Sequence, residues 1–265
     1  MSVIYAIPSR GRAKVVGEKT IRALSDAGVA ATDIHLWVDE DEEGEYLAAI
    51  DRPKVGEIKV GPRGTNLRDK RNLIARAYPV GTRLVECDDD VTAYWYARTR
   101  KRPLTPLNNL PTLVEWAFRT CDRLGIGLWG LYPVDNPYFM RPAATTDLRY
   151  IAGPTWGFTV TGDDTELVAL DDKEDFERSA RFAIRDGGVL RINWASYSTS
   201  YYGDTGGMQA YRTPESVTDG ALRLAAMYPE MVKIKQAANH RGTTEVTLTR
   251  GYSVCPPLQV PREWS

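Results

Sequence analysis

The sequence has few cysteines, no long hydrophobic run and almost no net charge. Cys87, Cys121 and Cys255 are odd in number and widely spaced, which argues against a disulfide scaffold and a cysteine-rich zinc site. No apolar stretch approaches the roughly 18 residues of a membrane-spanning helix, and the first residues lack the order of a secretory signal. A net charge of -1 argues against a strongly basic nucleic-acid-binding protein. We therefore expect a protein of the reducing cytoplasm that makes no use of a membrane.

What the chain does contain is the pattern of a folded α/β protein. Its 265 residues are 43% hydrophobic and 26% charged, a balance that supports a sizeable core. Apolar runs at 3–7, 34–38, 57–60 and 83–87 predict strands, and they alternate with helical patterns at 14–28 and 66–77. Such alternation predicts a mainly parallel sheet flanked by helices.

The second half is less regular. It predicts helices at 111–124, 173–186 and 214–228, strands at 127–131, 155–161, 189–194 and 243–249, and a Tyr-, Ser- and Gly-rich loop at 197–207. No stretch has the composition of a linker, so we predict a single domain. Ser9, Asp39 and Asp88 follow predicted strands, and ligands bind beyond the carboxyl ends of strands in such sheets.

The strongest local feature is the run Asp88-Asp89-Asp90. Adjacent carboxylates repel one another unless they are solvated or paired with a cation. Carboxylate oxygens suit Mg or Mn, which keep some waters and bridge to substrate phosphates. A solvated turn is the alternative. Charge also alternates in blocks: seven acids and no base at 39–51, nine bases and two acids at 52–83, and eight acids with one base at 163–177. This alternation fits either ordinary solvated surface or a site for a metal and a phosphate together.

Other candidates are weaker on their own. Glu174 and Asp175 open a predicted helix, where they are either dipole-favoured acids or a general base for a hydroxyl. His240 is either a surface residue or a third metal ligand. Residues 8–12 and 63–66 could bind phosphate through arginines and a helix N-terminus. Neither segment matches a P-loop or a G-x-G-x-x-G motif, which disfavours a P-loop ATPase or an NAD enzyme. Aromatic residues that could stack on a sugar or base, or belong to the core, are Tyr94, Trp95, Tyr96, Trp156, Tyr197, Tyr201 and Tyr202.

These features occur in the order found in GT-A fold nucleotide-sugar glycosyltransferases, which the chain resembles. Residues 88–90 resemble the D-x-D motif, and residues 153–157 resemble the glycine-containing acceptor loop. Residues 173–175 resemble the x-E-D motif, and His240 resembles the C-terminal metal-binding histidine. The resemblance implies a Rossmann-type GT-A domain with a nucleotide-sugar-binding half at 1–91, an acceptor-binding and catalytic half at 92–255, and a tail at 256–265.

The resemblance also implies roles for single residues. A divalent metal, Mn or Mg, would be held by Asp88, Asp90 and His240. The catalytic base would be Asp175, positioned by Glu174, and the acceptor would meet Trp156 and Gly157. The donor-binding residues would be Pro8, Ser9, Arg10, Arg12, Asp39, Arg71 and Asp89.

A narrower likeness rests on residues 8–12, 70–72, 88–91, 173–177 and 187–191. These segments are similar to the TET-associated glycosyltransferases of bacteriophages, a family thought to attach sugars to hydroxymethylated pyrimidines in phage DNA. This likeness implies a nucleotide-sugar donor such as UDP-glucose and a DNA acceptor carrying 5-hydroxymethylcytosine. The basic residues Arg98, Arg100, Lys101 and Arg102 could form a local DNA surface or a solvated loop.

Three other functions remain open at this point. The acceptor could be a polysaccharide or a small molecule. The chain could be a nucleotidyltransferase, which would release pyrophosphate. It could also be a non-catalytic nucleotide- or DNA-binding module. The sequence does not specify the sugar, the stereochemical outcome or the oligomeric state.

Overall fold

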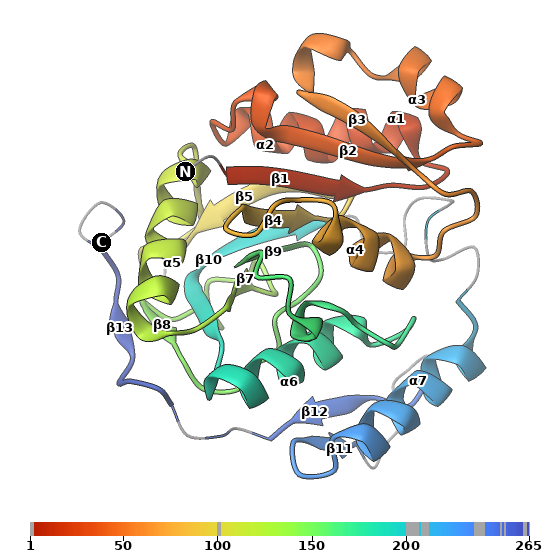
Figure 1. Cartoon of the computed structure of the whole chain (residues 1–265). Coiled ribbons are helices and arrows are strands. Elements are labelled where there is room, and N and C mark those ends of the chain that lie inside the picture. The colour runs from red at the N-terminus through yellow and green to blue at the C-terminus, as the bar shows by residue number, and fades with distance from the viewer. Residues whose placement is uncertain are drawn as a thin grey trace.

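A mixed β-sheet runs through the centre of the molecule (Figure 1). The computed structural model describes residues 3–99, 102–199, 207, 212–235, 242–249, 251, 253–261 and 264. The strands of the central sheet, in chain order, are β1 (Val3–Pro8), β2 (Ile34–Asp39), β3 (Glu57–Gly61), β4 (Arg83–Cys87), β5 (Val91–Tyr96), β6 (Thr105–Pro106), β7 (Leu128–Tyr132), β8 (Ala143–Thr145), β9 (Thr155–Thr159), β10 (Leu190–Thr199) and β13 (Leu258–Gln259).

The sheet order is β13-β8-β10-β7-β9-β4-β1-β2-β3, and β5 pairs with both β10 and β6. The four N-terminal strands β3-β2-β1-β4 are all parallel, as are β7 and β10. Strand β9 lies between these two parallel groups and pairs with β4 and with β7, antiparallel to both. The carboxyl ends of β1 and β4 therefore lie at one edge of the sheet, which is where the sequence predicts a ligand.

Helices cover both faces of this sheet. They are α1 (Ala13–Val16), α2 (Arg22–Asp26), α3 (Glu43–Ala49), α4 (Leu67–Arg76), α5 (Leu110–Leu124), α6 (Glu174–Asp186) and α7 (Pro214–Met227). A π-helical turn (Gly17–Ile21) joins α1 and α2 into one helical stretch. Short 3₁₀ turns lie at Ala31–Asp33, Arg52–Lys54 and Asp164–Glu166.

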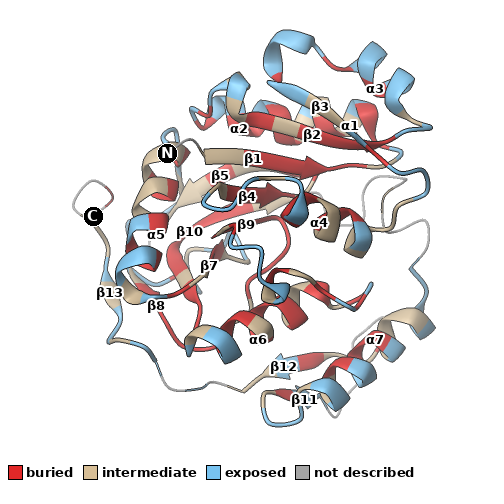
Figure 2. Ribbon diagram, viewed as in Figure 1, coloured by how far each residue is buried: buried red, intermediate tan, exposed pale blue. Residues whose placement is uncertain are grey.

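The core is divided by the sheet into two layers. On one face, α1, α2, α3 and α5 pack on the sheet through residues such as Leu24, Tyr46 and Phe118. On the other face, Ile74 of α4 and Phe182 of α6 pack against strand residues. Figure 2 shows that the buried residues follow the strands and the inward helix faces. Because both faces are covered, the N-terminal strands are continuous apolar runs.

A third, smaller cluster lies below the sheet in Figure 1. Helix α7 packs there on the two-stranded sheet formed by β11 (Val232–Ile234) and β12 (Val246–Leu248). Its N-terminus carries a capping box in which Thr213 and Ser216 bond reciprocally, and Pro214 occupies the first turn. Strand β12 is the predicted late strand at 243–249, and it is shorter than predicted.

Local capping explains where the other long helices begin and end. The Asn66 side chain accepts a hydrogen bond from the Asp69 N–H at the start of α4, and Asn109 caps α5 in the same way. Helix α5 ends at Gly125, whose φ of 66° is the left-handed conformation that glycine adopts without strain. All three cysteines lie among the described residues and are free thiols, as expected.

The structure differs from the sequence prediction around β5 and β10. Residues 91–96 form strand β5, for which the sequence predicted no element, and β10 extends beyond the predicted strand at 189–194 through Thr199 to pair with it. Tyr197, expected in a loop, is consequently buried in β10, and Tyr94 is buried in β5. These two tyrosines belong to the core and do not stack on a ligand. Tyr201 and Tyr202 lie outside the described residues.

Candidate active site

A cavity of about 1130 Å³ opens at the carboxyl ends of β1 and β4. It is lined by the segments that follow these strands, by the N-termini of α4, α6 and α7, and by the loop before β9. Of the predicted site residues, those that line it are Pro8, Ser9, Arg10, Arg12, Asp88, Asp89, Asp90, Glu174 and Asp175. The structure thus brings both predicted halves of the site, the donor side and the catalytic pair, into one cavity.

The turn formed by Asp88, Asp89 and Asp90 is held from below by Thr20. The buried Thr20 hydroxyl donates to the Asp88 carbonyl oxygen at 2.7 Å and accepts from the Val91 N–H at 2.9 Å. Thr20 lies in the π-helical turn, a local irregularity that is frequent at functional sites. The two hydrogen bonds of Thr20 therefore fix the direction in which the three carboxylates leave the sheet.

Replacing Thr20 with valine keeps the shape of the side chain but removes both hydrogen bonds. We expect the Thr20→Val protein to lose about 1–3 kcal/mol of stability, because the Val91 N–H and the Asp88 carbonyl lose their buried partner. Urea unfolding measures the loss. Thr32, whose hydroxyl is exposed near Asp33, gives the matched control Thr32→Val, which should unfold like the wild type. Equal stability of both variants would contradict the role of Thr20.

Asp89 is hydrogen-bonded to the N-terminal loop that follows β1. It is 6% exposed, and it accepts hydrogen bonds from the Ser9 hydroxyl and from Arg12, each at 2.8 Å. The Ser9 hydroxyl also lies 2.8 Å from the Tyr46 hydroxyl, which accepts from the Arg12 N–H at 3.2 Å. The predicted donor-binding residues at 9, 12 and 89 are therefore one connected group.

Asp39 and Lys70 form a second group beneath the first. Lys70 Nζ lies 2.6 Å from Asp39 Oδ1 and donates to the Ser9 carbonyl oxygen at 2.7 Å. Asp39 also accepts from the Thr65 N–H at 3.0 Å and is fully buried, so it does not line the cavity. Burial lowers the pKa of Lys70, and the hydrogen bond to Asp39 opposes that shift.

Arg71 links the Asp88 turn to the predicted catalytic pair. It donates to Glu86 at 2.9 Å and to Asp88 at 2.8 Å, and its Nε lies 3.6 Å from Glu174. Burial opposes its charge, but Asp88, Glu86 and Glu174 together raise its pKa. Basic side chains of a helix usually face solvent, but Lys70 and Arg71 are both 3% exposed. Each faces inward because buried carboxylates surround it.

The donor set at this edge fits a divalent metal. Asp88 and Asp90 both line the cavity, and the Asp90 side chain is 16% exposed. Burial and then the neighbouring Asp88 and Asp89 raise the pKa of Asp90 to about 7, a repulsion that a bound cation relieves. Among the described residues, no three acidic, histidine or cysteine side chains converge as a complete metal cage. Mg and similar ions need only one or two carboxylates plus substrate phosphates.

The predicted third ligand, His240, lies outside the described residues. Its role stays a prediction. The nearest described residues on either side of it, Lys235 and Gly242, belong to the connection between β11 and β12. Thr243 and Glu245 of the same connection line the large cavity.

Glu174 and Asp175 begin α6 at the cavity wall. Lys173, immediately before them, has a φ of 70°, the one positive φ of a non-glycine residue in the described chain. This left-handed residue turns the backbone so that the helix N-terminus meets the cavity. Asp175 accepts from the Tyr150 hydroxyl at 2.5 Å through Oδ2 and from the Phe176 N–H at 2.9 Å through Oδ1. Its carboxylate is therefore held in one orientation.

Glu174 has a different environment from Asp175. It is 5% exposed, and burial followed by the charge of Asp175 raises its pKa to about 7. Arg71 and Arg178 oppose this shift without cancelling it. At neutral pH a substantial fraction of Glu174 is therefore protonated.

The raised pKa of Glu174 predicts a pH-dependent stability. The folded protein binds the Glu174 proton more tightly than the unfolded chain, so stability falls as pH rises from about 4.5 to about 7. Glu174→Gln should remove this penalty, gaining up to roughly 3 kcal/mol at pH 8 and almost nothing at pH 4.5. Urea unfolding at the two pH values measures the difference. A gain that is equal at both would contradict the assignment.

Trp156 and Gly157 do not reach the cavity. Both are buried in β9, and neither lines the pocket, which is a correction to the predicted acceptor contact. The Trp156 ring lies 3.5 Å from the guanidinium of Arg178 and stacks on Phe158. A side chain at Gly157 would collide with the ring of Trp129 at 2.7 Å. These residues support the site from beneath it.

Arg178 is a buried charge that the sequence reading missed. It is 1% exposed, and its Nε and Nη2 have no hydrogen-bond partner among the described residues. Burial, then Arg71, lowers its pKa to about 10, while Glu174 and Glu86 favour its charge. Its four-residue spacing from Glu174 on α6 was the only sequence signal that it belongs to the site. The sequence contains no such signal for Tyr150 and Arg212, because their partners are distant along the chain. These partners are Asp175 for Tyr150 and Asp172, at 2.5 Å, for Arg212.

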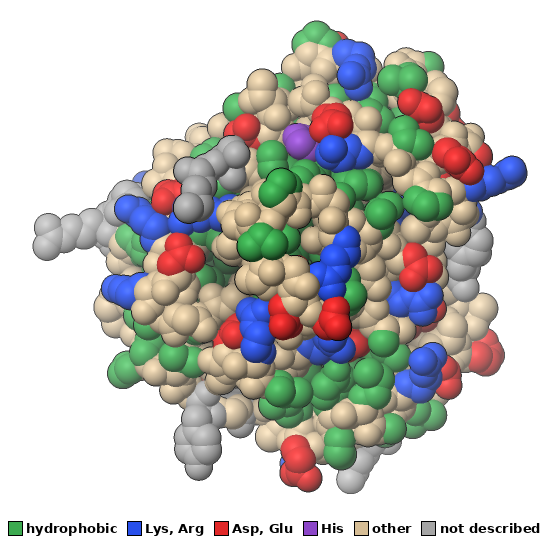
Figure 3. Space-filling model, in the orientation of Figure 1, with side chains coloured by type: hydrophobic (Ala, Val, Ile, Leu, Met, Phe, Trp, Pro, Cys, Tyr) green, Lys and Arg blue, Asp and Glu red, His purple; other side chains and the backbone are tan. Residues whose placement is uncertain are grey.

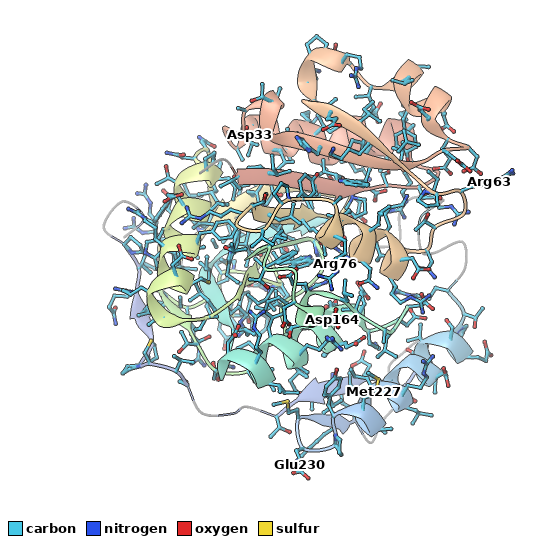
Figure 4. The ribbon with its side chains drawn as sticks, in the orientation of Figure 1. Asp33, Arg63, Arg76, Asp164, Met227 and Glu230 are labelled. Carbon is cyan, nitrogen blue, oxygen red and sulfur yellow. The ribbon has the colours of Figure 1, made fainter. Side chains whose placement is uncertain are left out.

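A further contact joins α4 to the segment between β9 and α6. Arg76 lies 2.6 Å from Asp164, and Figure 4 shows the two side chains pointing toward each other from their elements. Asp164 is 89% exposed, so this ion pair adds little stability.

Gly153 matters more to the site, since a Cβ there would lie 3.0 Å from Arg71 and 3.1 Å from Asp88. The loop before β9 approaches the site closely only because residue 153 is glycine.

Known structures share this fold. The chain resembles S. aureus TarS 1–349 in complex with UDP, with a TM-score of 0.56 and 13% identity over 87% of this chain and 66% of that one. It also resembles a longer S. aureus TarS structure, with a TM-score of 0.55 and 15% identity over 87% of this chain and 40% of that one. No protein-family model and no curated protein matches the sequence.

A mannosyltransferase, PcManGT from Pyrobaculum calidifontis in complex with GDP-Man and Mn2+, is matched with a TM-score of 0.46 and 13% identity over 86% of this chain and 75% of that one. The TarS likenesses show the fold. They confirm the predicted fold class, an α/β domain with a mostly parallel central sheet flanked by helices. No helix among the described residues is long and apolar enough to cross a membrane.

Proposed function

We propose that the chain is a glycosyltransferase that takes a sugar from a nucleotide-sugar donor, with UDP as the nucleotide. The observation that carries the proposal is the shared cavity, which Asp175 and the Asp88–Asp90 turn both line. A base for an acceptor hydroxyl and a polar site for a diphosphate are the two parts that glycosyl transfer requires. The TarS complex with UDP, which shares the fold, supports the choice of donor.

In this proposal each side chain has a definite task. The acceptor oxygen attacks the anomeric carbon of the sugar, its proton passes to Asp175, and the bond from that carbon to the diphosphate breaks. Tyr150 keeps Asp175 oriented through its hydroxyl hydrogen bond. Ser9, Arg12 and Asp89 form the wall against which the nucleotide lies.

A divalent metal, Mn or Mg, would be held by Asp88 and Asp90, with His240 as a further ligand. Such an ion neutralises the charge of the donor diphosphate and makes it a better leaving group. Within the chain, Arg71 orients the Asp88 carboxylate, which it holds at 2.8 Å.

We further propose that the acceptor is the hydroxyl of a 5-hydroxymethylpyrimidine in DNA. The resemblance of residues 8–12, 70–72 and 173–177 to the TET-associated glycosyltransferases supports this acceptor. The proposed basic DNA surface is only partly described, since Arg100 and Lys101 lie outside the described residues while Arg98 is exposed. A polysaccharide or small-molecule acceptor, and a nucleotidyltransferase reaction, are the alternatives.

Release of the nucleotide tests the donor half of the proposal. The protein is incubated with UDP-glucose and Mn, and free UDP is measured with and without EDTA. We expect slow UDP release that EDTA abolishes and that Asp90→Asn reduces at least 100-fold. Release of pyrophosphate from a nucleoside triphosphate with no UDP release would instead favour the nucleotidyltransferase. No product from either donor would favour a binding module.

A further inference from the structure

A second hollow of about 310 Å³ lies on the sheet face that α6 covers, beside β8 and β10. It shares no lining residue with the large cavity. Its wall combines three arginines with three aromatic side chains: Arg141, Arg149, Arg191, Tyr132, Tyr138 and Phe139. The volume is at the lower end of the range of small-ligand sites.

The hollow has an excess of positive charge. Arg141 is exposed, its N–H donates to the Asn193 carbonyl at 2.9 Å, and no carboxylate of a described residue lies within ion-pair distance of its guanidinium. Arg149 is held by Asp147 at 2.8 Å, and Arg191 Nε donates to the Asn193 side-chain oxygen at 2.8 Å. Acidic and basic side chains are interspersed over the described part of the face in Figure 3.

Two aromatic rings stand open beside these arginines. Tyr138 is 70% exposed and Phe139 is 52% exposed, and their ring centroids lie 5.2 Å apart at an interplanar angle of 84°. A third ring, Tyr132, lies 5.1 Å from the guanidinium of Arg191. Large exposed aromatic side chains next to guanidinium groups are the combination that binds the bases and phosphates of single-stranded nucleic acids.

The hollow is connected to the proposed catalytic base through the chain itself. Arg149 lines the hollow, and the next residue, Tyr150, lines the large cavity and donates its hydroxyl hydrogen bond to Asp175. One short segment therefore carries both the contact to the proposed base and a wall of the second site.

We propose that this hollow binds the nucleotide adjacent to the one that is modified, with its phosphate on Arg141 and its base on Tyr138 and Phe139. The inference rests on the proposed function, since it assigns a second contact to the same DNA acceptor. Arginine forks suit phosphate oxygens, and each stacked base adds affinity that does not depend on sequence.

A double-variant design tests the phosphate contact. Single-stranded oligonucleotides with one 5-hydroxymethylcytosine are made with natural phosphates, or with one neutral methylphosphonate on either side of that base. Binding is measured for the wild type, Arg141→Ala and the control Arg123→Ala, an exposed arginine of α5 on the opposite sheet face. We expect Arg141→Ala and one methylphosphonate each to weaken binding about tenfold, and the two together no more than either alone.

A second variant tests the stacking. Tyr138→Ala should weaken binding about tenfold and raise KM for the oligonucleotide, with UDP release from the donor unchanged. Its exposed side chain makes no described core contact, so folding should be preserved. The slope of log affinity against log salt should fall by about 0.7 in Arg141→Ala and stay unchanged in Tyr138→Ala.

The outcomes separate this inference from the proposed function. If the wild type glycosylates the oligonucleotide while Arg141→Ala and Tyr138→Ala bind it like Arg123→Ala, the second site is wrong and the function stands. If the wild type releases UDP but neither binds nor modifies DNA, the DNA acceptor and this site both fail. If polyphosphate binds with the same loss in Arg141→Ala and none in Tyr138→Ala, the site recognises an anion and the nucleotide assignment is overturned.

Discussion

The Asp175→Asn protein is expected to bind UDP-sugar like the wild type and to transfer sugar about 1000-fold more slowly. Asparagine keeps the size of the side chain: its Oδ1 can still accept from the Phe176 N–H, and its Nδ2 can donate to the Tyr150 hydroxyl oxygen. It cannot take a proton from the acceptor. A positioned general base contributes roughly 100- to 10000-fold to a rate. Donor affinity by calorimetry and transfer rate by UDP release are the two measurements.

Asp26→Asn is the control for this substitution. Asp26 is an exposed aspartate in α2 that lies 3.9 Å from Arg22, and its replacement should change neither affinity nor rate. Loss of both donor affinity and turnover in Asp175→Asn would mean that Asp175 supports the structure of the site. Full activity in that variant would remove Asp175 from the mechanism altogether.

Arg71→Met is expected to be the most destabilising single change in the site. It leaves Glu86, Asp88 and Glu174 without their shared cation, and Glu86 is 1% exposed. Removing one partner of a buried ion pair costs about 3–5 kcal/mol. For a chain of this size that loss lowers Tm by on the order of 10 °C. Thermal unfolding followed by circular dichroism measures it.

A paired variant and a control make this prediction specific. The double variant Arg71→Met with Glu86→Gln should recover part of the stability, because it removes a buried charge on each side. Arg83 also bridges two carboxylates, Glu115 at 2.7 Å and Asp122 at 2.9 Å, but the side chains of these acids are 43% and 55% exposed. Arg83→Met should therefore cost about 1 kcal/mol or less. An equal cost for both arginines would contradict the buried network.

The sequence predicted the first half of the fold well because its signals there are local. The apolar runs of β1, β2 and β4 are buried on both faces, so their composition alone identifies them. Asn66 before α4 and Gly125 after α5 mark helix ends through bonds within a few residues. Placing Ser9 and Asp88 at strand ends then follows from the order of the elements.

The parts that failed depend on partners far along the chain. Strand β5 exists because it pairs with β10, a hundred residues away, and that pairing buries Tyr94 and Tyr197. Lys70 and Arg71 have the sequence pattern of an exposed face. Only the folded sheet brings Asp39, Glu86 and Asp88 to them. Charged residues become buried where counter-charges arrive from other elements, and no local pattern reports that.

The candidate site shows the same division. Residues at 9, 12, 88–90, 174 and 175 were predicted, and they share one cavity. The supporting residues Thr20, Tyr150 and Arg178 were not predicted, since each acts through a hydrogen bond, a stack or a charge from another element. The sequence thus predicted the residues that line the cavity better than the residues that hold them.

Mass analysis of a DNA acceptor tests the central proposal most directly. The protein is incubated with Mn, a UDP-sugar and DNA that contains 5-hydroxymethylcytosine, and the DNA is then digested to nucleosides and weighed. We predict a modified nucleoside heavier by one sugar residue, formed by the wild type and absent with Asp175→Asn. UDP release without any heavier nucleoside would contradict the DNA acceptor, and neither UDP nor a new nucleoside would contradict the glycosyltransferase itself.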